Sequence, residues 1–300
     1  MKLQNTALLV MVMAIWGFNF SVIKIGLDGF PPLLLATGRF FFAAFPAVFF
    51  LPRPTCDYKW VLLFGLFSGV GQFGFLFFGM AAGMSAGLAS VMLQSQVFFT
   101  LILSSIIFGE VIGKRSMFGI VLAVIGVVII GSIQDTDTNI LAVMLVLMGA
   151  LCWAIANTIT KQAGAINMLS FIVWSSLVPI MPLYLASYVV DGMDTVHAAI
   201  IDMTAIGFGS LMYLAYATTL LGYGIFSYMI RQHGLAKVAP FTLVVPVFGI
   251  IGSYLMFDDT FNAPKVIAIA LILSGLAIIV LKPRLPSWFG RHADRQKPQA

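Results

Sequence analysis

The sequence predicts an all-α polytopic membrane protein in which ten transmembrane helices form two inverted five-helix repeats. Three observations carry this prediction: a strongly apolar composition, about ten apolar segments of spanning length, and motifs that occur once in each half. Of the 300 residues, 61% are hydrophobic and only 9% are charged. Because soluble domains carry roughly 25% charged residues, most of the surface of this protein must face lipid.

The apolar segments each approach the roughly 20 residues that a spanning helix needs. The first follows Lys2 and is too long for the apolar core of a signal peptide, so we interpret it as a helix. The connections are short and carry proline, glycine or charged residues, which leaves no room for a soluble domain. The segments lie near residues 6–26, 31–51, 60–79, 85–108, 115–133, 139–160, 169–190, 203–226, 235–257 and 264–282.

Lysine and arginine are distributed unevenly between the two sides of the predicted bundle. An even number of spans places both termini on one side, which also receives most of the 16 Lys and Arg residues. The opposite side receives Lys24 and Lys265, and Arg39 falls within a span. Since basic loops stay in the cytoplasm, we expect both termini there.

A nine-residue motif occurs once near the start of each half. Residues 16–24 read WGFNFSVIK and residues 153–161 read WAIANTITK. A second match pairs Phe108-Gly109-Glu110, at the end of the fourth segment, with Phe257-Asp258-Asp259, at the end of the ninth. Matches in the same order along both halves indicate that the chain contains an internal repeat.

The matches divide the chain into repeats at residues 1–134 and 135–282, followed by a basic cytoplasmic tail at 283–300. Each repeat holds five predicted spans, and because five is an odd number, the second repeat enters the membrane from the opposite side. Inverted repeats are typical of transporters that hold their substrate near the membrane midplane, between the repeats, and that work by alternating access.

Longer strings run through nearly the whole chain and carry a family resemblance. They are WGFNFSVIK at 16–24, FPPLLLATGRF at 30–40, GMSAGLASVMLQSQVFFT at 83–100, FGE at 108–110, VWSSLVPIMP at 173–182, LMYLAYATTLLGYGI at 211–225 and VAPFTLVVPV at 238–247. Together they resemble the EamA family of the drug/metabolite transporter (DMT) superfamily. The resemblance implies a bacterial inner-membrane efflux protein with a central cavity, which exports amino-acid metabolites of the O-acetylserine and cysteine type.

Arg39 lies about eight residues into the second segment, too deep to reach the membrane surface easily. A charge at this depth costs at least a few kcal/mol, so it should face a wet cavity or a partner group. One interpretation is that its guanidinium binds the carboxylate of the substrate. The other is a contact that locks two helices together. The second half has no matching cation, because Trp174 or Ser176 falls near the equivalent position, and this asymmetry suits a substrate with one anionic end.

Other polar and aromatic residues within the spans are further candidates for substrate binding. Unpaired amides are expensive in lipid, so the Asn and Gln side chains should face the bundle interior, where they bind substrate or bond to neighbouring helices. The Trp side chains form walls of the cavity or anchor the helices at the membrane surface. Tyr216 and Tyr223 share a face of an α-helix. The candidates are Trp16, Asn19, Gln72, Gln96, Trp153, Asn157 and Tyr216.

Glu110 and Asp259 are paired by the repeat and lie at helix ends on opposite sides of the membrane. They are candidates for gating or for coupling to protons. The alternative is structural: a charge pair with the connection at Lys114 and Arg115, or a helix cap. Lys24 and Lys161 are expected at the membrane interface.

Several function classes lack their sequence signals. The chain has neither a G-x-x-x-x-G-K-[ST] loop nor an H-E-x-x-H motif, and its basic residues are scattered rather than clustered as nucleic-acid binding requires. We therefore expect no enzyme activity, cofactor, metal or nucleic acid, and as partners a small amino acid or derivative, the lipid bilayer and, as a candidate coupling ion, the proton. Two alternatives stay open: an exporter of aromatic amino acids or drug-like metabolites, and a structural or regulatory membrane protein that transports nothing.

Overall fold

The computed structural model describes residues 1–133, 139–164 and 166–281. Within these residues all regular elements are helical, and ten segments are long and apolar enough to cross a membrane. The predicted all-α fold with ten spans is confirmed. The predicted tail at 283–300 and the predicted boundary between 134 and 135 lie outside the described residues. The spans are Leu3–Leu27, Pro32–Phe49, Tyr58–Ala81, Ala86–Phe108, Lys114–Ser132, Ile140–Ala163, Met168–Asp191, Ala205–His233, Ala239–Phe257 and Ala263–Val280.

The two halves divide their spans into helical pieces in the same pattern, as an internal repeat requires. The first and fifth spans are unbroken helices: α1 (Leu3–Leu27) and α7 (Lys114–Ser132), then α8 (Ile140–Ala163) and α16 (Ala263–Val280). The second spans are interrupted: α2 (Pro32–Ala44) with η1 (Ala47–Phe49), then α9 (Met168–Ser175) with α10 (Ile180–Asp191). The third spans carry a central π-helix: α3 (Tyr58–Phe64), η2 (Gly65–Phe73) and α4 (Gly74–Ala81), then α12 (Ala205–Met212), η4 (Tyr213–Gly222) and α13 (Tyr223–His233). The fourth spans contain a 3₁₀ turn: α5 (Ala86–Met92), η3 (Leu93–Ser95) and α6 (Gln96–Phe108), then η5 (Ala239–Val244) and α15 (Val245–Phe257), which the short α14 (Leu235–Val238) precedes.

Side-chain caps and turn residues fix where several helices begin and end. Gly109 and Asp258 follow α6 and α15 with φ of +67° and +52°, the left-handed conformation that commonly terminates a helix. At the starts of five helices a side-chain oxygen accepts a hydrogen bond from a backbone N–H three residues on, which satisfies a donor that the helix leaves free. These caps are Ser85, Asn139, Asn167, Thr204 and Asn262.

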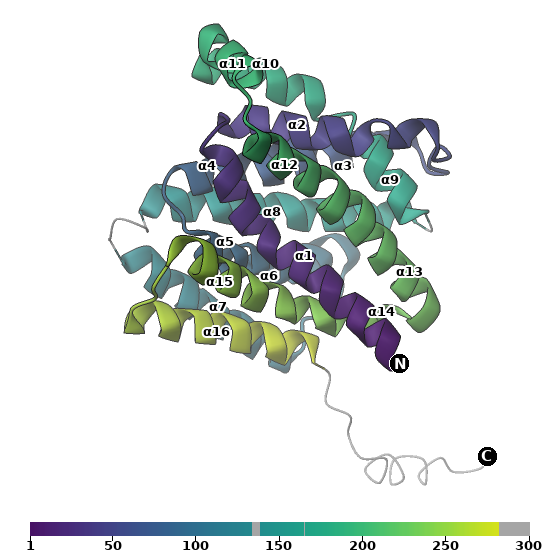
Figure 1. The fold of residues 1–300 in the computed structure, drawn as a ribbon. Coiled ribbons are helices and arrows are strands. Elements are labelled where there is room, and N and C mark those ends of the chain that lie inside the picture. Colours follow the sequence, from purple (N-terminus) through teal and green to yellow (C-terminus); the bar gives the residue numbers. More distant parts are fainter. Residues whose placement is uncertain (134–138, 165, 282–300) are drawn as a thin grey trace, which may run out of the picture.

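A short helix, α11 (Met193–Ile201), fills the connection between the seventh and eighth spans, for which the sequence predicts only a loop. Asp194 lies in its first turn, where the helix dipole favours a carboxylate. Val196 is buried, so the helix also has an apolar contact with the bundle. α10 and α11 lie together at one edge of the molecule, and α7 and α16 lie at the opposite edge (Figure 1).

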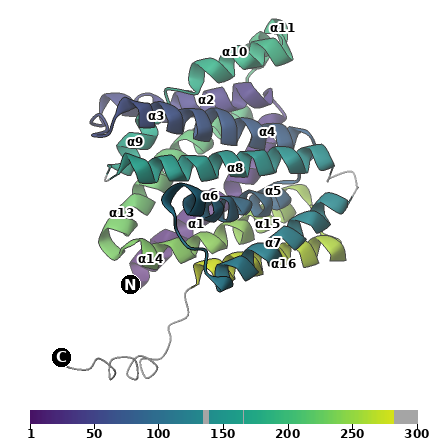
Figure 2. The same cartoon turned by 180° about the vertical axis from the view of Figure 1, so that it is seen from behind.

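Helices from opposite halves pack closely against one another. α7 and α16 lie side by side in both views (Figures 1 and 2). A Cβ atom on Gly119 would lie 2.6 Å from the carbonyl oxygen of Gly275, so the two backbones touch because neither carries a side chain. α1 meets α15 in a similar way, since a Cβ atom on Gly17 would lie 2.4 Å from Cβ of Phe248. The two halves are therefore interlocked rather than separate units.

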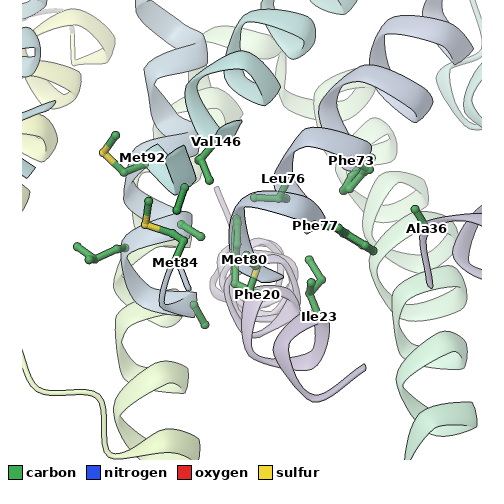
Figure 3. Close-up of a cluster of buried hydrophobic side chains, with 14 of the residues drawn as sticks. Phe20, Ile23, Ala36, Phe73, Leu76, Phe77, Met80, Met84, Met92 and Val146 are labelled. Carbon is green, nitrogen blue, oxygen red and sulfur yellow. The ribbon is translucent and has the colours of Figure 1, made fainter. Parts of the chain in front are cut away.

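Buried apolar side chains fill the end of the bundle opposite to the N-terminus. Ile23 belongs to this group and directly precedes Lys24 in the last turn of α1, which fixes its position along the bundle. The side chains interdigitate between helices of both halves (Figure 3). We call this group the apolar cluster; it consists of Phe20, Ile23, Ala36, Phe73, Leu76, Phe77, Met80, Met84, Met92 and Val146.

Candidate functional site

A cavity of about 910 Å³ lies between the two halves. Its lining ends at the exposed residues Gly164, Asn167 and Arg231. Asn5, near the N-terminus, hydrogen-bonds His233 at 2.7 Å, so this mouth lies at the end of the bundle that holds the N-terminus. The apolar cluster closes the other end. The cavity is therefore accessible from one side only.

Arg39 lies where the cavity meets the apolar cluster, with 4% of its surface exposed. Its Nη1 donates to Oδ1 of Asn19 and its Nη2 to Oγ1 of Thr218, each at 3.3 Å. Cζ of the guanidinium lies over the ring of Phe73, 3.9 Å from the ring centre. Its Nε has no hydrogen-bond partner among the described residues. Arg39 thus joins α1, α2 and η4, and its Nε is left without a partner among the described residues. Its role in binding the substrate carboxylate stays a prediction.

Trp16 forms an aromatic wall of the cavity. Its indole Nε1 donates to the carbonyl oxygen of Thr218 at 2.9 Å, in the π-helix η4. The ring packs against Tyr223 and Phe226, with centres 5.1 and 5.0 Å away. A π-helix bonds residue i to i+5 rather than i+4, so the indole contributes a bond to backbone that departs from α-helical pairing. Trp16 therefore holds α1 against η4, next to Arg39.

Amide groups line another wall of the cavity. Nδ2 of Asn157 donates to Oε1 of Gln96 at 3.0 Å and lies 3.3 Å from Oγ1 of Thr100, which joins α8 to α6. Gln72 is 5% exposed, and its Oε1 accepts no hydrogen bond from any residue that the structure describes. Trp153 completes this wall and packs against Phe64, with ring centres 6.1 Å apart. Gln72 thus offers an unused acceptor beside the cavity.

Tyr216 is the predicted binding residue that the cavity lining does not include. Its hydroxyl instead lies 3.4 Å from the carbonyl oxygen of Phe45. The prediction placed Tyr216 and Tyr223 on one face because they are seven residues apart in an assumed α-helix. Residues 213–222 form a π-helix, whose wider turn rotates Tyr216 away and leaves Tyr223 in the lining. Tyr216 therefore lies outside this cavity lining, and its role in substrate binding stays a prediction.

Thr218 is a site residue that the sequence reasoning missed. Its hydroxyl accepts from Arg39 and donates to the carbonyl oxygen of Leu214 at 2.6 Å, while its own carbonyl oxygen accepts from Trp16. A threonine in a spanning helix usually bonds to its own backbone, so nothing in the local sequence marks it. Only the meeting of α1, α2 and η4 reveals its role.

Glu110 and Asp259 lie at opposite ends of the bundle, and each forms an ion pair with a lysine of the other half. Glu110 pairs with Lys161 rather than with the connection at Lys114 and Arg115. Asp259 lies 3.6 Å from Nζ of Lys24. Neither acid belongs to the cavity lining. Their role in gating or proton coupling stays a prediction.

The lining contains two arginines, Arg39 and Arg231, and no carboxylate within the described ranges. The same ranges contain no group of three or more His, Cys, Asp or Glu side chains that could hold a metal ion. What the site offers chemically is a buried cation at its inner limit, with amide groups and aromatic rings along the cavity.

The family model described as "EamA-like transporter family" matches this chain twice, over residues 5–132 and 140–281. The chain therefore belongs to the EamA family, and the ten apolar spans make it a multi-pass membrane transporter. The family assignment predicted from the sequence is confirmed, and the two matches fit its inverted repeat.

The chain is 39% identical over 288 residues to a "Probable amino-acid metabolite efflux pump" of Escherichia coli (strain K12), with 93% of this chain and 96% of the relative covered. It is 25% identical over 284 residues to the "Uncharacterized inner membrane transporter YedA" of the same strain, covering 89% and 87%. A solved structure described only as "Crystal structure of protein" superposes with a TM-score of 0.59 at 14% identity, covering 97% and 99%, which shows a shared fold.

Proposed function

We propose that this transporter exports small amino-acid metabolites, of the O-acetylserine and cysteine type, across a bacterial inner membrane by alternating access. The observation that carries the proposal is Arg39, a buried cation at the inner limit of a cavity that is accessible from one side. The names of the two Escherichia coli relatives, a "Probable amino-acid metabolite efflux pump" and an "Uncharacterized inner membrane transporter", support the substrate class and the membrane.

The guanidinium of Arg39 suits a carboxylate. Asn19 and Thr218 hold its two terminal nitrogens, which fixes the plane of the group before the substrate arrives. Charge-assisted hydrogen bonds to a carboxylate are about twice as strong as neutral ones, and a donor that needs no rearrangement loses little entropy on binding. We propose that the carboxylate of the substrate docks against this preorganised cation.

The far end of the substrate would meet the amide wall. The Oε1 of Gln72 is buried without a partner, and a rotation of this side chain toward the cavity would let it accept from an ammonium or hydroxyl group. Asn157 with Gln96 offers both donors and acceptors. The aromatic side chains of Trp16 and Trp153 lie along the same cavity and can cover the apolar part of the substrate. Together these groups would recognise a small molecule with one anionic and one polar end.

The direction of transport follows from the open end of the cavity. The mouth lies at the end that holds the N-terminus, and the positive-inside rule predicts that this end faces the cytoplasm. A cavity open to the cytoplasm is the state that loads substrate for export. For release, the apolar cluster must separate while the mouth closes.

A second substrate class follows from the aromatic wall. Trp16, Tyr223 and Phe226 form a continuous group of rings beside the cavity. Such a surface also suits aromatic amino acids or drug-like metabolites. A screen for resistance to toxic analogues would separate the two classes, and a structural protein without transport activity would give resistance to neither.

A growth assay tests the proposal. Cells that lack the gene should become sensitive to excess cysteine, and the wild-type gene should restore growth. The variant Arg39→Ala should behave like the deletion, whereas Arg53→Ala, which removes an exposed arginine outside the cavity, should restore growth fully. Full protection by Arg39→Ala would exclude the carboxylate role, and unchanged sensitivity of the deletion strain would exclude this substrate class.

A further inference from the structure

Two clusters, each made of a lysine, a carboxylate and a phenylalanine ring, join the halves of the protein, one at each end of the bundle. In the first, Nζ of Lys24 lies 3.6 Å from Asp259 and 4.2 Å from the ring centre of Phe257. In the second, Nζ of Lys161 pairs with Glu110 and lies 4.1 Å from the ring centre of Phe108. We call them the Lys24 clamp and the Lys161 clamp.

The two clamps are related by the repeat in every part. Each lysine lies in the last turn of the first helix of its half, α1 or α8. Each aromatic ring and acid flank a single left-handed residue, Gly109 or Asp258, that ends the fourth span of the other half. Each clamp therefore ties the first span of one half to the fourth span of the other.

A clamp could be a gate, which breaks when its end of the transporter opens, or a joint, which stays closed. The state of the cavity decides between these two roles. A gate must be broken at whichever end of the transporter is open. Lys161 follows Thr160 in the chain, and Thr160 lines the open cavity, so the Lys161 clamp lies at the open end. The Lys161–Glu110 pair is nevertheless formed. Opening of the mouth therefore occurs without breaking the clamp at that end.

Close packing along the same helices also indicates that the clamped helices stay together. The backbones of α1 and α15 touch at Gly17, as described above, and a Cβ atom on Gly252 of α15 would lie 2.8 Å from Oγ of Ser21. In the Lys24 clamp, Ser253 donates to Asp259 and accepts from the backbone N–H of Gly87 at 2.9 Å. α8 and α6 are also joined away from the Lys161 clamp, by the bond from Asn157 to Gln96. Contacts this close between backbones resist sliding of one helix against the other.

We propose that the two clamps are permanent joints that stay closed through the transport cycle. They define two moving bodies, α1 with α15 and α8 with α6, each of which combines helices from both halves. The halves of the sequence are then not the bodies that rock against each other. This inference rests on the proposed alternating-access function, and it assigns to Lys24, Lys161, Glu110 and Asp259 a positioning role in that motion.

Reversible cross-linking of each clamp tests the proposal. Cysteine pairs would replace Lys24 with Asp259, or Lys161 with Glu110, in a background carrying Cys56→Ser and Cys152→Ala. A bifunctional methanethiosulfonate reagent would bridge each pair in proteoliposomes. If the clamps are joints, efflux of labelled O-acetylserine, which has no thiol that could reduce the cross-link, is the same after cross-linking as in the same variant without reagent. Loss of efflux that a reducing agent restores would overturn the proposal.

A control pair shows that the assay detects a blocked motion. Ile23 on α1 and Met80 on α4 both belong to the apolar cluster, which must separate for release. Cross-linking Ile23→Cys to Met80→Cys should therefore abolish efflux in the same background. Retained efflux in this control would mean that the apolar cluster does not separate during transport. That result would contradict the alternating-access motion from which we infer the joints.

Hydrogen exchange distinguishes failure of this inference from failure of the proposed substrate. Amide exchange in α4 and α5, at the closed end, needs no substrate and reports how often that end opens. If the clamps are joints, amide hydrogen exchange in α4 and α5 is equally fast with and without a cross-linked clamp. This result is expected even if the wild-type protein transports no cysteine. Slower exchange after cross-linking the Lys24 clamp would identify it as a gate.

Discussion

The guanidinium of Arg39 is bonded to the side chain of Asn19, with Nη1 and Oδ1 3.3 Å apart. This contact places the cation of the second span against the first span, whose motif recurs in the other half. A buried arginine held by neutral groups keeps its full charge available for a ligand, since no carboxylate neutralises it within the described cavity lining. The relationship connects the repeat, the cavity and the proposed substrate.

Replacing Arg39 with lysine should impair transport although the charge is retained. Lysine lacks the planar fork that Asn19 and Thr218 orient. Hydrogen bonds to charged groups contribute about 1.5–3 kcal/mol, which corresponds to about a ten- to hundredfold rise in KM. Concentration series in proteoliposomes would measure the change, with Arg53→Lys as the matched control. An unchanged KM for Arg39→Lys would show that the fork geometry is not used.

Replacing Thr218 with valine should raise KM by about tenfold. One terminal nitrogen of Arg39 would lose its acceptor, and the hydrogen bond that orients the guanidinium contributes about 1–1.5 kcal/mol to the free energy of binding. Thr219→Val is the matched control. The hydroxyl of Thr219 also donates to the carbonyl oxygen of Leu214, but within the described residues it makes no hydrogen bond to Arg39. Equal effects of the two substitutions would show that the loss comes from packing in η4 and not from Arg39.

Substitution of Gly17 by alanine should destabilise the fold. The new methyl group would lie 2.4 Å from Cβ of Phe248 and 2.7 Å from the carbonyl oxygen of Val245, so α1 and α15 must separate. Overpacking of this kind costs about 1–3 kcal/mol. Thermal denaturation in detergent should show a lower midpoint. Gly209→Ala is the control, because no described atom lies within 4 Å of the added group, and a lowered midpoint there would contradict the explanation.

The two clamps should differ in their contribution to stability. The side chains of the Lys24 pair are 36% and 14% exposed, whereas those of the Lys161 pair are 47% and 53% exposed. Exposed pairs contribute little, about 0.2–1 kcal/mol, and an acid left unpaired in a more buried place costs more. Lys24→Gln should therefore lower the denaturation midpoint more than Lys161→Gln. The reverse order would show that burial does not govern these pairs.

The fold could be predicted because its signals are local. Spanning length is visible as apolar segments, and the repeat is visible as matched strings such as 16–24 and 153–161. Most residues of the candidate site could also be predicted from the local sequence. Arg39, Gln72 and Asn157 could be assigned to the interior because charges and amides are costly in lipid, and all three line the cavity.

The remaining features depend on tertiary contacts or on departures from α-helical geometry. The π-helix at 213–222 leaves no trace in hydrophobic periodicity, so the sequence could not show that Tyr216 lies outside the cavity lining while Tyr223 lies within it. Thr218 acquires its role only where three helices meet. The lysine clamps join residues that are more than 50 positions apart and belong to opposite halves, so no local pattern could pair them.

Efflux of labelled O-acetylserine and cysteine from proteoliposomes, with and without a pH gradient, is the most direct test of the central claim. The account predicts flux above that of empty vesicles for the wild-type protein and near-background flux for Arg39→Ala. Faster efflux in the presence of the pH gradient would show that transport is coupled to protons. Glu110 and Asp259 would then be the first residues to test as proton-binding groups. Absence of flux from the folded wild-type protein under both conditions would contradict the proposed substrate class, and equal flux from Arg39→Ala would contradict the assigned binding site.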